Sequence, residues 1–182
     1  MRIFLPLVGL MMMAGCAPTP RLETVTAIDN APYRIGAGDR LRITTYGEQS
    51  LTGECPVDGQ GQLQFALLGD ISVAGRTLAE VRDDLTQRLS TQYLRSPRVS
   101  VDVAAYRPVY ILGEIARPGE FPYAERMNVM ALIAKAGGFT TWANRKFVYI
   151  KRESDSVERA YPLVPSLAVH PGDQLRVAQS PY

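Results

Sequence analysis

The chain has 182 residues, which suits one or two small domains. Its formal net charge at pH 7 is +2, and this near-neutral balance argues against electrostatic capture of nucleic acid or of a strongly anionic surface. The sequence contains one histidine, His170, and two cysteines, with no Cys-x-x-Cys pair and no phosphate-binding loop. We therefore expect no catalytic site, no metal and no other cofactor.

The first residues have the features of a bacterial secretory signal. Arg2 gives a positive start, and an apolar run follows from Ile3 to Met13, too short for a permanent membrane span. The small residues before Cys16 resemble a lipobox, in which residues 1–15 are removed and Cys16 is acylated. Ala17 follows the cysteine. By resemblance to enterobacterial lipoproteins, an aspartate at this position would mark the protein for retention in the inner membrane. Its absence favours the outer membrane. A plain signal peptide with a chance cysteine is the alternative.

Residues 16–32 predict a tether between the lipid and the folded part. They contain three prolines and show no sustained hydrophobic period, and order is expected from Tyr33 onward. Cys55 would then be the only cysteine without a lipid, so it cannot form an intramolecular disulfide. We interpret Cys55 as a small, half-buried hydrophobic residue.

The first half of the folded part predicts the element order β-β-β-α-β. Two early strands alternate with the period of a half-buried strand. Their inward residues are Leu41, Ile43, Thr45, Leu63, Phe65 and Leu67. A short strand is expected at 70–75, and Thr77 and Glu80 then have the spacing of a capping box. They begin a helix of about three turns, with an apolar stripe of Leu78, Val81, Leu85 and Leu89. Alternating valines over residues 98–104 predict the last strand.

The second half predicts β-β-α-β with one further strand, which is a β-grasp-like order. Strands are expected at residues 108–115, 146–152 and 173–177, and the second of these looks buried on both faces. Pro118 and Gly119 suit the two central positions of a type II turn between two strands. Asn128 can cap a helix, and Gly137 and Gly138 can end it in the left-handed conformation.

These elements place the chain in the α+β class. We expect a small mixed β-sheet domain with one helix over residues 33–105. A β-grasp-like domain follows over residues 106–178, and its C-terminal strand closes a sheet. Residues 179–182 form a short tail.

One phrase occurs twice, as GAGDRLRI from residue 36 and HPGDQLRV from residue 170. In each copy a glycine, Gly38 or Gly172, permits a sharp backbone turn. The next residue, Asp39 or Asp173, can accept hydrogen bonds from backbone N–H groups of that turn before a strand begins. Either a common turn recurs by chance, or the two strands have matching roles in the fold.

The order and spacing of these segments resemble bacterial polysaccharide export proteins of the Wza type. The resemblance covers about residues 33–178. It is carried by YRIGAGDRLRI, VDGQGQLQFALLGDISVAGRTLAEVRDDLTQRL, SPRVSVDVAAYRPVYILGEIARPGEF, AKAGGFTTWANRKFVYIKR and HPGDQLRV. It implies a polysaccharide export domain followed by one SLBB domain, which is a β-grasp module.

The resemblance also implies a location and partners. Such proteins are lipid-anchored at the periplasmic face of the outer membrane and form rings, an octamer in the best-known case, through which capsular polysaccharide or exopolysaccharide passes. They work with an inner-membrane polysaccharide co-polymerase. Long members end in an amphipathic helix that pierces the outer membrane, whereas the few residues after the last predicted strand are too short for a hydrocarbon core of about 30 Å. We therefore expect a separate outer-membrane pore, such as a β-barrel.

Three residues are candidates for contact with polysaccharide or with a neighbouring subunit, namely Trp142, Tyr106 and Arg107. An aromatic residue in a loop, such as Trp142, can stack on a sugar ring or lie at a subunit contact, and local packing is the alternative. Tyr106 and Arg107 lie between the two predicted domains, where interdomain packing is the alternative. A second candidate function is a lipid-anchored β-grasp module that binds a soluble ligand as a monomer, and oligomeric state separates the two functions.

Overall fold

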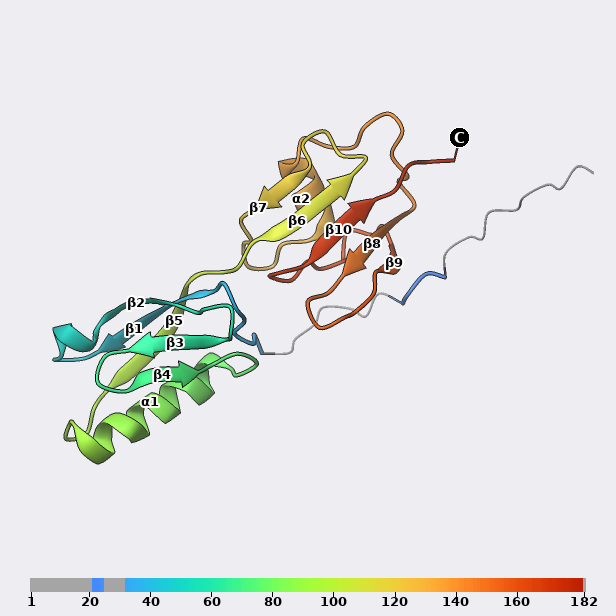
Figure 1. The fold of residues 1–182 in the computed structure, drawn as a ribbon. Helices are drawn as coiled ribbons and strands as arrows, with labels where there is room; N and C mark the ends of the chain where they lie inside the picture. The colour runs from blue at the N-terminus through green and yellow to red at the C-terminus, as the bar shows by residue number, and fades with distance from the viewer. Residues whose placement is uncertain (1–20, 25–31, 182) are drawn as a thin grey trace, which may run out of the picture.

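Alternating apolar residues build two separate hydrophobic cores in the computed structural model, which describes residues 21–24 and 32–181. One core is drawn from residues 35–103 and the other from residues 109–177. Figure 1 shows that the chain forms two lobes, joined where it passes from the first to the second. The α+β class is thereby confirmed. The predicted signal peptide and the predicted lipidation site Cys16 lie outside the described residues.

The first lobe is built on a three-stranded antiparallel sheet with the order β2-β1-β5. The strands are β1 (Arg40–Thr45), β2 (Gly53–Pro56) and β5 (Val99–Ala105), with a 3-10 turn, η1 (Gln49–Leu51), between the first two. Along β1 the alternation confirms the predicted inward face, because Leu41, Ile43 and Thr45 are buried. The sequence prediction missed β2, which contains Cys55. Cys55 is half-buried against this core, as interpreted.

A second, two-stranded antiparallel sheet joins β3 (Gln62–Phe65) to β4 (Gly69–Ser72). Leu63 and Phe65 are buried as predicted, but the inward placement of Leu67 is wrong. The strand ends at Phe65, and Leu67 lies in the turn with a φ of 68° and a side chain that is 57% exposed.

Helix α1 (Leu78–Gln92) lies along the first lobe on the side of β3, β4 and β5 (Figure 1). The predicted capping box is confirmed, since the Thr77 N–H donates to Glu80 Oε2 at 2.7 Å and the Glu80 N–H donates to Thr77 Oγ1 at 3.3 Å. Its buried residues are Val81, Leu85 and Leu89. The helix is longer than predicted, because the periodicity reveals the buried stripe but not the exposed last turn.

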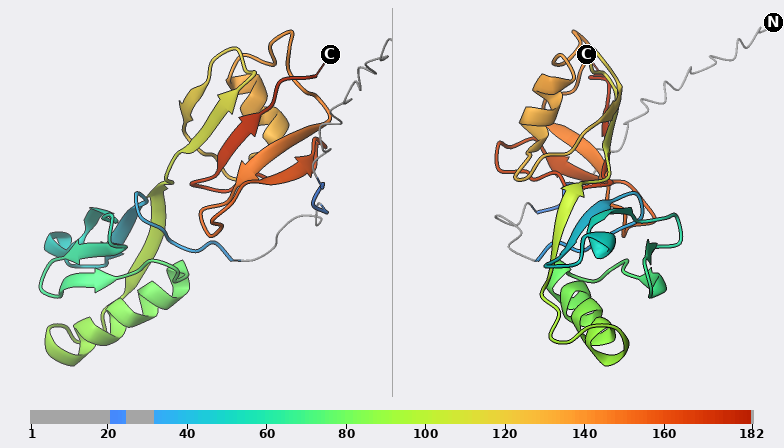
Figure 2. Two further views of the ribbon diagram at one scale, coloured as in Figure 1. Left: turned by 45° about the vertical axis from the view of Figure 1, so that its right-hand side comes forward. Right: turned by 90° about the vertical axis from the view of Figure 1, so that its left-hand side faces the viewer.

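The second lobe contains a five-stranded sheet with the order β7-β6-β10-β8-β9. Its strands are β6 (Val109–Gly113), β7 (Gly119–Phe121), β8 (Phe147–Lys151), β9 (Arg159–Pro162) and β10 (Gln174–Val177). The last strand completes the sheet from its centre, parallel to β6 and antiparallel to β8. Helix α2 (Val129–Lys135) covers one face of the sheet (Figure 1, Figure 2).

In the second lobe, the structure confirms the predicted helix cap but not the predicted type II turn. The cap at Asn128 is confirmed, because its side chain accepts the Ala131 N–H at 2.8 Å. The type II turn at Pro118 and Gly119 is wrong. Gly119 is the first residue of β7, with a φ of 149° rather than the value of about +80° that this turn requires. Strand β8 is fully buried on one face only, and β9 was missed.

The described part of the predicted tether contacts the second lobe. Leu22 pairs with Ala160 of β9, and the Glu23 N–H donates to the Ala160 carbonyl at 2.7 Å. In residues 21–24 and 32–181, no helix is both long enough and apolar enough to cross a bilayer.

Candidate functional site

The two copies of the repeated phrase form the same backbone turn. In residues 36–39 and 170–173, the aspartate N–H donates to the carbonyl three positions earlier, over 3.2 and 3.1 Å. Gly38 and Gly172, at the third position, have φ values of 89° and 83°. These values define type II turns, and Pro171 occupies the second position that proline favours there. Each turn leads directly into a strand, β1 or β10.

The aspartates that end these turns are buried in the same way. Asp39 and Asp173 are each 1% exposed. Each accepts, at Oδ2, the backbone N–H of the first residue of its turn over 2.7 Å. Each also pairs with an arginine, Arg107 for Asp39 and Arg152 for Asp173. Buried carboxylates require such partners, so each turn of the repeated phrase is completed by an arginine that lies outside the phrase.

Arg107 joins the two lobes. Its backbone N–H donates to Asp39 Oδ1 at 2.9 Å, and its guanidinium donates to Asp39 Oδ2 at 2.9 Å and to the Tyr33 hydroxyl at 2.8 Å. On the other side, the guanidinium pairs with Glu153, which follows β8, at 2.6 Å. One side chain therefore connects the first turn of the first lobe to the end of a strand in the second.

Glycines of both turns make room for this guanidinium. A Cβ atom on Gly36 would lie 2.5 Å from Arg107 Cζ, and a Cβ atom on Gly172 would lie 2.9 Å from Arg107 Nε. The two turns therefore face each other across Arg107. This geometry gives the repeated phrase matching roles at one junction, where it brings together five of the sequence-predicted residues, namely Gly38, Asp39, Arg107, Gly172 and Asp173.

Three tyrosines pack beside Arg107. The ring of Tyr106 meets Tyr33 and Tyr123 edge to face, with centroid distances of 5.1 and 5.2 Å. The Tyr106 hydroxyl donates to Glu125 at 2.7 Å. Burial raises the pKa of both Tyr33 and Tyr106, so both hydroxyls stay protonated. Tyr106 thus packs between the lobes, and the structure favours the interdomain alternative for it.

A cleft of about 410 Å³ opens beside the junction. Tyr110, Gln174 and Lys151 line it from neighbouring positions on β6, β10 and β8. Arg107, Arg152 and Glu153 complete its inner wall. The three cationic side chains, Arg107, Lys151 and Arg152, are balanced by Asp39, Asp173 and Glu153, so the cleft can make polar contacts but has little net charge with which to hold an anion.

The buried carboxylate of Asp173 makes stability depend on pH. Burial raises the pKa of Asp173 from 3.8 to about 6, although Arg152 opposes the rise. The folded protein therefore binds this proton more tightly than the unfolded chain does. Between these two pKa values the free energy of unfolding falls as pH rises, and above the upper value this contribution is constant.

The variant Asp173→Asn is expected to lose this pH dependence. As pH rises from 3.8 to about 6, the window between the two pKa values of Asp173, the free energy of unfolding of the wild type should fall by on the order of 3 kcal/mol relative to that of the variant. Urea unfolding of both proteins, at several pH values within the window and one above it, measures the difference. Asp83→Asn, at an exposed site, is the control. Parallel curves for wild type and Asp173→Asn would show that Asp173 does not carry the effect.

Trp142 is remote from the junction. It lies in the segment between α2 and β8, 62% exposed, and its carbonyl accepts the Ser180 N–H at 2.7 Å. Arg107 lies beside Gly172, which precedes the start of β10, whereas Ser180 follows the end of β10. Trp142 and Arg107 are therefore placed at opposite ends of this strand. The helix α2 terminus nearby has the expected backbone, with φ values of 86° and 89° at Gly137 and Gly138.

The described residues contain no group of three or more histidine, cysteine, aspartate or glutamate side chains that could hold a metal ion. The adjacent carboxylates of Asp83 and Asp84 do not act as a pair. Asp84 binds Arg76 at 2.8 Å and Arg88 at 2.7 Å, while Asp83 binds Arg82. Asp84 is partly buried, with a side chain that is 19% exposed, whereas the side chain of Asp83 is 69% exposed.

These features define a two-domain α+β protein in which a small antiparallel domain is fixed to a helix-covered sheet through a buried arginine. Residues 27–104 match the family described as polysaccharide biosynthesis/export protein, and residues 108–159 match the SLBB domain. The chain belongs to the polysaccharide export proteins of the Wza type, with an export domain followed by an SLBB domain, as the resemblance implied.

Similar curated proteins have related names. The chain is 30% identical, over 81% of its length, to EPS I polysaccharide export outer membrane protein EpsA of Ralstonia nicotianae, covering 48% of that protein. It is 33% identical, over 58% of its length, to exopolysaccharide production protein ExoF of Rhizobium meliloti, covering 28% of that protein. It is 23% identical, over 60% of its length, to polysialic acid transport protein KpsD of Escherichia coli, covering 20% of that protein. The chain thus spans less than half of each relative.

Proposed function

We propose that this protein is a periplasm-facing, outer-membrane component of a conduit that exports capsular polysaccharide or exopolysaccharide. The observation that carries the proposal is the succession of the export and SLBB domains, in a chain similar to EpsA over 81% of its length. The junction around Arg107 supports it, because subunits of a conduit must hold their domains at a fixed angle. The weakly charged cleft is compatible with weak binding, which a polymer that passes through a conduit requires.

The proposal includes finer parts that the sequence predicts. We propose acylation of Cys16, a domain boundary between Ala105 and Tyr106, and assembly into a ring, an octamer by family resemblance. The expected partners are the inner-membrane co-polymerase and a separate outer-membrane pore. Ring assembly is physically reasonable, since one head-to-tail contact repeated around an axis closes into a ring when the rotation fits.

Two measurements test the proposed function. Deletion of the gene should abolish secretion of polysaccharide by the cells, and the wild-type gene should restore it, whereas a Cys16→Ala variant should not. Light scattering on the chain from Ala17 onward should show a discrete assembly of many subunits, alone or with the periplasmic domain of the co-polymerase. Normal secretion after deletion would reject the proposal. A strict monomer under both conditions would favour the ligand-binding module.

Trp142→Ala is expected to lower polysaccharide secretion several-fold while changing the free energy of unfolding by no more than about 0.5 kcal/mol. The reason is its exposure, 62%, which leaves the indole free for a sugar or a neighbouring subunit. Tyr46→Ala is a matched control, because Tyr46 is an aromatic residue that is 61% exposed on the other domain. Unchanged secretion together with a clear loss of stability would assign Trp142 to local packing.

A further inference from the structure

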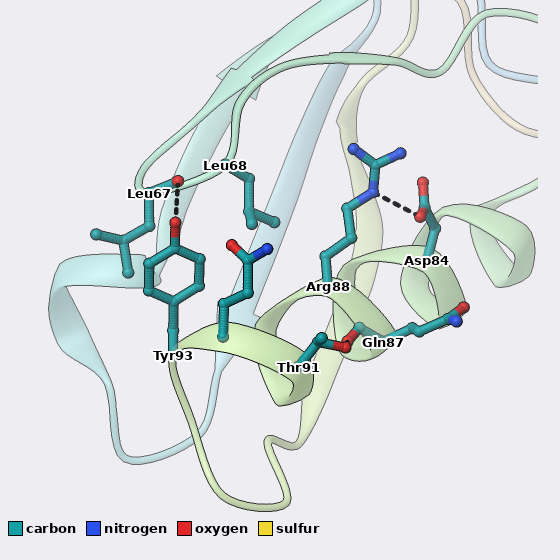
Figure 3. A pocket seen from close by; sticks show the side chains of 8 residues that line it. Leu67, Leu68, Asp84, Gln87, Arg88, Thr91 and Tyr93 are labelled. Carbon is teal, nitrogen blue, oxygen red and sulfur yellow. Dashed lines mark hydrogen bonds and ion pairs between the residues drawn. The ribbon is translucent and has the colours of Figure 1, made fainter.

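A groove of about 510 Å³ runs along α1 on the export domain, far in the sequence from the junction residues (Figure 3). One wall is the turn between β3 and β4, and the other is the second half of α1 with the residue that follows it. The lining residues are Leu67, Leu68, Asp84, Gln87, Arg88, Thr91, Gln92 and Tyr93. None of the sequence-predicted site residues lies here, so the groove needs its own explanation.

One end of the groove is apolar and held in place. Leu67 adopts a left-handed backbone, with a φ of 68°, that leucine rarely uses, and its side chain is 57% exposed. The Tyr93 hydroxyl donates to the Leu67 carbonyl at 3.1 Å, as Figure 3 shows. This bond ties the turn to the end of α1. Tyr93 nevertheless remains 45% exposed, so part of an anchored aromatic ring is open to a ligand.

The helix wall carries two rows of polar side chains at four-residue spacing. Asp84, Arg88 and Gln92 form one row, and Gln87 and Thr91 form the other. The first row is about 12 Å long at 1.5 Å of rise per residue. Among the described residues, the side-chain amides of Gln87 and Gln92 make no hydrogen bond with the protein. Two donor and acceptor groups therefore line the groove without a protein partner.

The charges along the groove neutralise one another. Asp84 binds Arg88 at 2.7 Å and, behind it, Arg76 at 2.8 Å. Burial acts to raise the pKa of Asp84, but the two guanidinium groups outweigh it and lower the pKa, so the carboxylate stays ionised. With its charges paired, the groove offers directional polar groups rather than an electrostatic trap for anions.

We infer that this groove is a contact site for the saccharide chain, an inference that rests on the proposed function. Sugar hydroxyl groups both donate and accept hydrogen bonds, so they can accept from amide N–H and guanidinium groups and donate to amide oxygens and carboxylates. They also present apolar ring faces, which a partly exposed tyrosine and leucine can cover. A peptide strand would need a free sheet edge and an amphipathic helix would need an apolar groove, and these walls provide neither.

Photo-crosslinking in producing cells tests the inference on the full chain. A benzophenone amino acid is placed at Gln87, which is exposed in the groove, or at Arg82, which is exposed on α1 outside it. After irradiation, the protein is purified under denaturing conditions, hydrolysed and analysed for the sugars of the polymer that these cells make. We expect the sugars with the Gln87 probe only, and none from cells that cannot start polymer synthesis.

Other results of this experiment overturn the inference. A polymer-independent crosslink from Gln87 to a second copy of the chain would show that a neighbouring subunit covers the groove. Equal sugar recovery from the two probes would show unspecific proximity, and recovery from neither would exclude contact. If gene deletion itself leaves secretion unchanged, the proposed function fails. If deletion abolishes secretion but the Gln87 probe captures no sugar, only the groove inference fails.

A variant pair tests the same groove by secretion. Gln87→Ala with Gln92→Ala removes both unpartnered amides from an exposed surface, so we expect normal folding and a several-fold fall in secreted polysaccharide. Gln49→Ala with Gln64→Ala removes two exposed amides elsewhere on the same domain and should leave secretion unchanged. Equal secretion from the two double variants would contradict the inference.

Discussion

Arg107→Ala is expected to lower the free energy of unfolding by about 3–5 kcal/mol, because it leaves a buried carboxylate without its partner. Asp39 is 1% exposed, and Arg107 meets it with both a backbone N–H and a guanidinium. The loss of the guanidinium also breaks the contact with Glu153 in the other domain. Thermal unfolding followed by calorimetry should therefore show a lower first transition and a separation of the two domains into distinct transitions.

A matched pair of variants separates this effect from the loss of any arginine. Arg42→Ala removes an ion pair with Glu54 of 2.7 Å between side chains that are 59% and 42% exposed, and should change stability by less than about 1 kcal/mol. Arg107→Ala combined with Asp39→Asn should be less destabilised than Arg107→Ala alone, because no buried charge is left unpaired. Equal losses for Arg107→Ala and Arg42→Ala would show that the junction does not hold the domains.

The junction also has a consequence for assembly under the proposed function. A ring closes only if each subunit repeats the same rotation relative to its neighbour. A chain whose two domains change their angle would close with variable subunit numbers or remain open. We therefore expect Arg107→Ala to broaden the mass distribution that light scattering measures, even under conditions in which both domains stay folded.

Elements with strong local signals could be predicted from the sequence. Both helices carry their start signals in the chain, at Thr77 and Asn128, and β1 shows its alternation directly. The missed strands, β2 and β9, are short and lack alternating apolar residues. They form because their backbones pair with a neighbouring strand, so tertiary contacts decide them.

The Pro-Gly dipeptide adopts different conformations at residues 118–119 and 171–172. It forms a type II turn at Pro171, whereas at Gly119 the glycine pairs with Ile111 in a strand. Nothing in the dipeptide distinguishes the two, since the difference lies in what is paired with each segment.

The candidate site could be predicted only in part. The repeated phrase identified Asp39 and Asp173 as turn residues, and the position of Arg107 between the domains suggested a junction role. The pairing of Asp39 with Arg107 spans 68 residues, and no local pattern reports a contact of that range. A cationic partner is expected once an aspartate is known to be buried, but the burial of Asp39 and Asp173 is itself seen only in the structure. The groove on α1 had no such signal, because its residues resemble an ordinary solvated helix face.

Gly113 is a further position that sequence reasoning missed. It is the last residue of β6, with a φ of 88°, and it pairs with Val177 of the central strand β10. A Cβ atom at this position would overlap the carbonyl oxygen of Val177. That oxygen also accepts the Glu114 N–H at 3.0 Å. A lone glycine at the end of an apolar strand was the available signal for such a close backbone approach.

Gly113→Ala should therefore lower the free energy of unfolding by about 2–5 kcal/mol, the sum of left-handed backbone strain and the displacement of β10 from β6. Gly47→Ala separates these two contributions. Gly47 has a φ of 87° but nothing within 4 Å of a built Cβ atom, so only strain of about 1–2 kcal/mol is expected there. Urea unfolding by circular dichroism measures both variants. If the two variants lose equal stability, the overlap with the Val177 carbonyl does not add to the cost of backbone strain. A larger loss for Gly113→Ala would show that the parallel pairing of β6 with β10 requires a residue without a Cβ atom at this position.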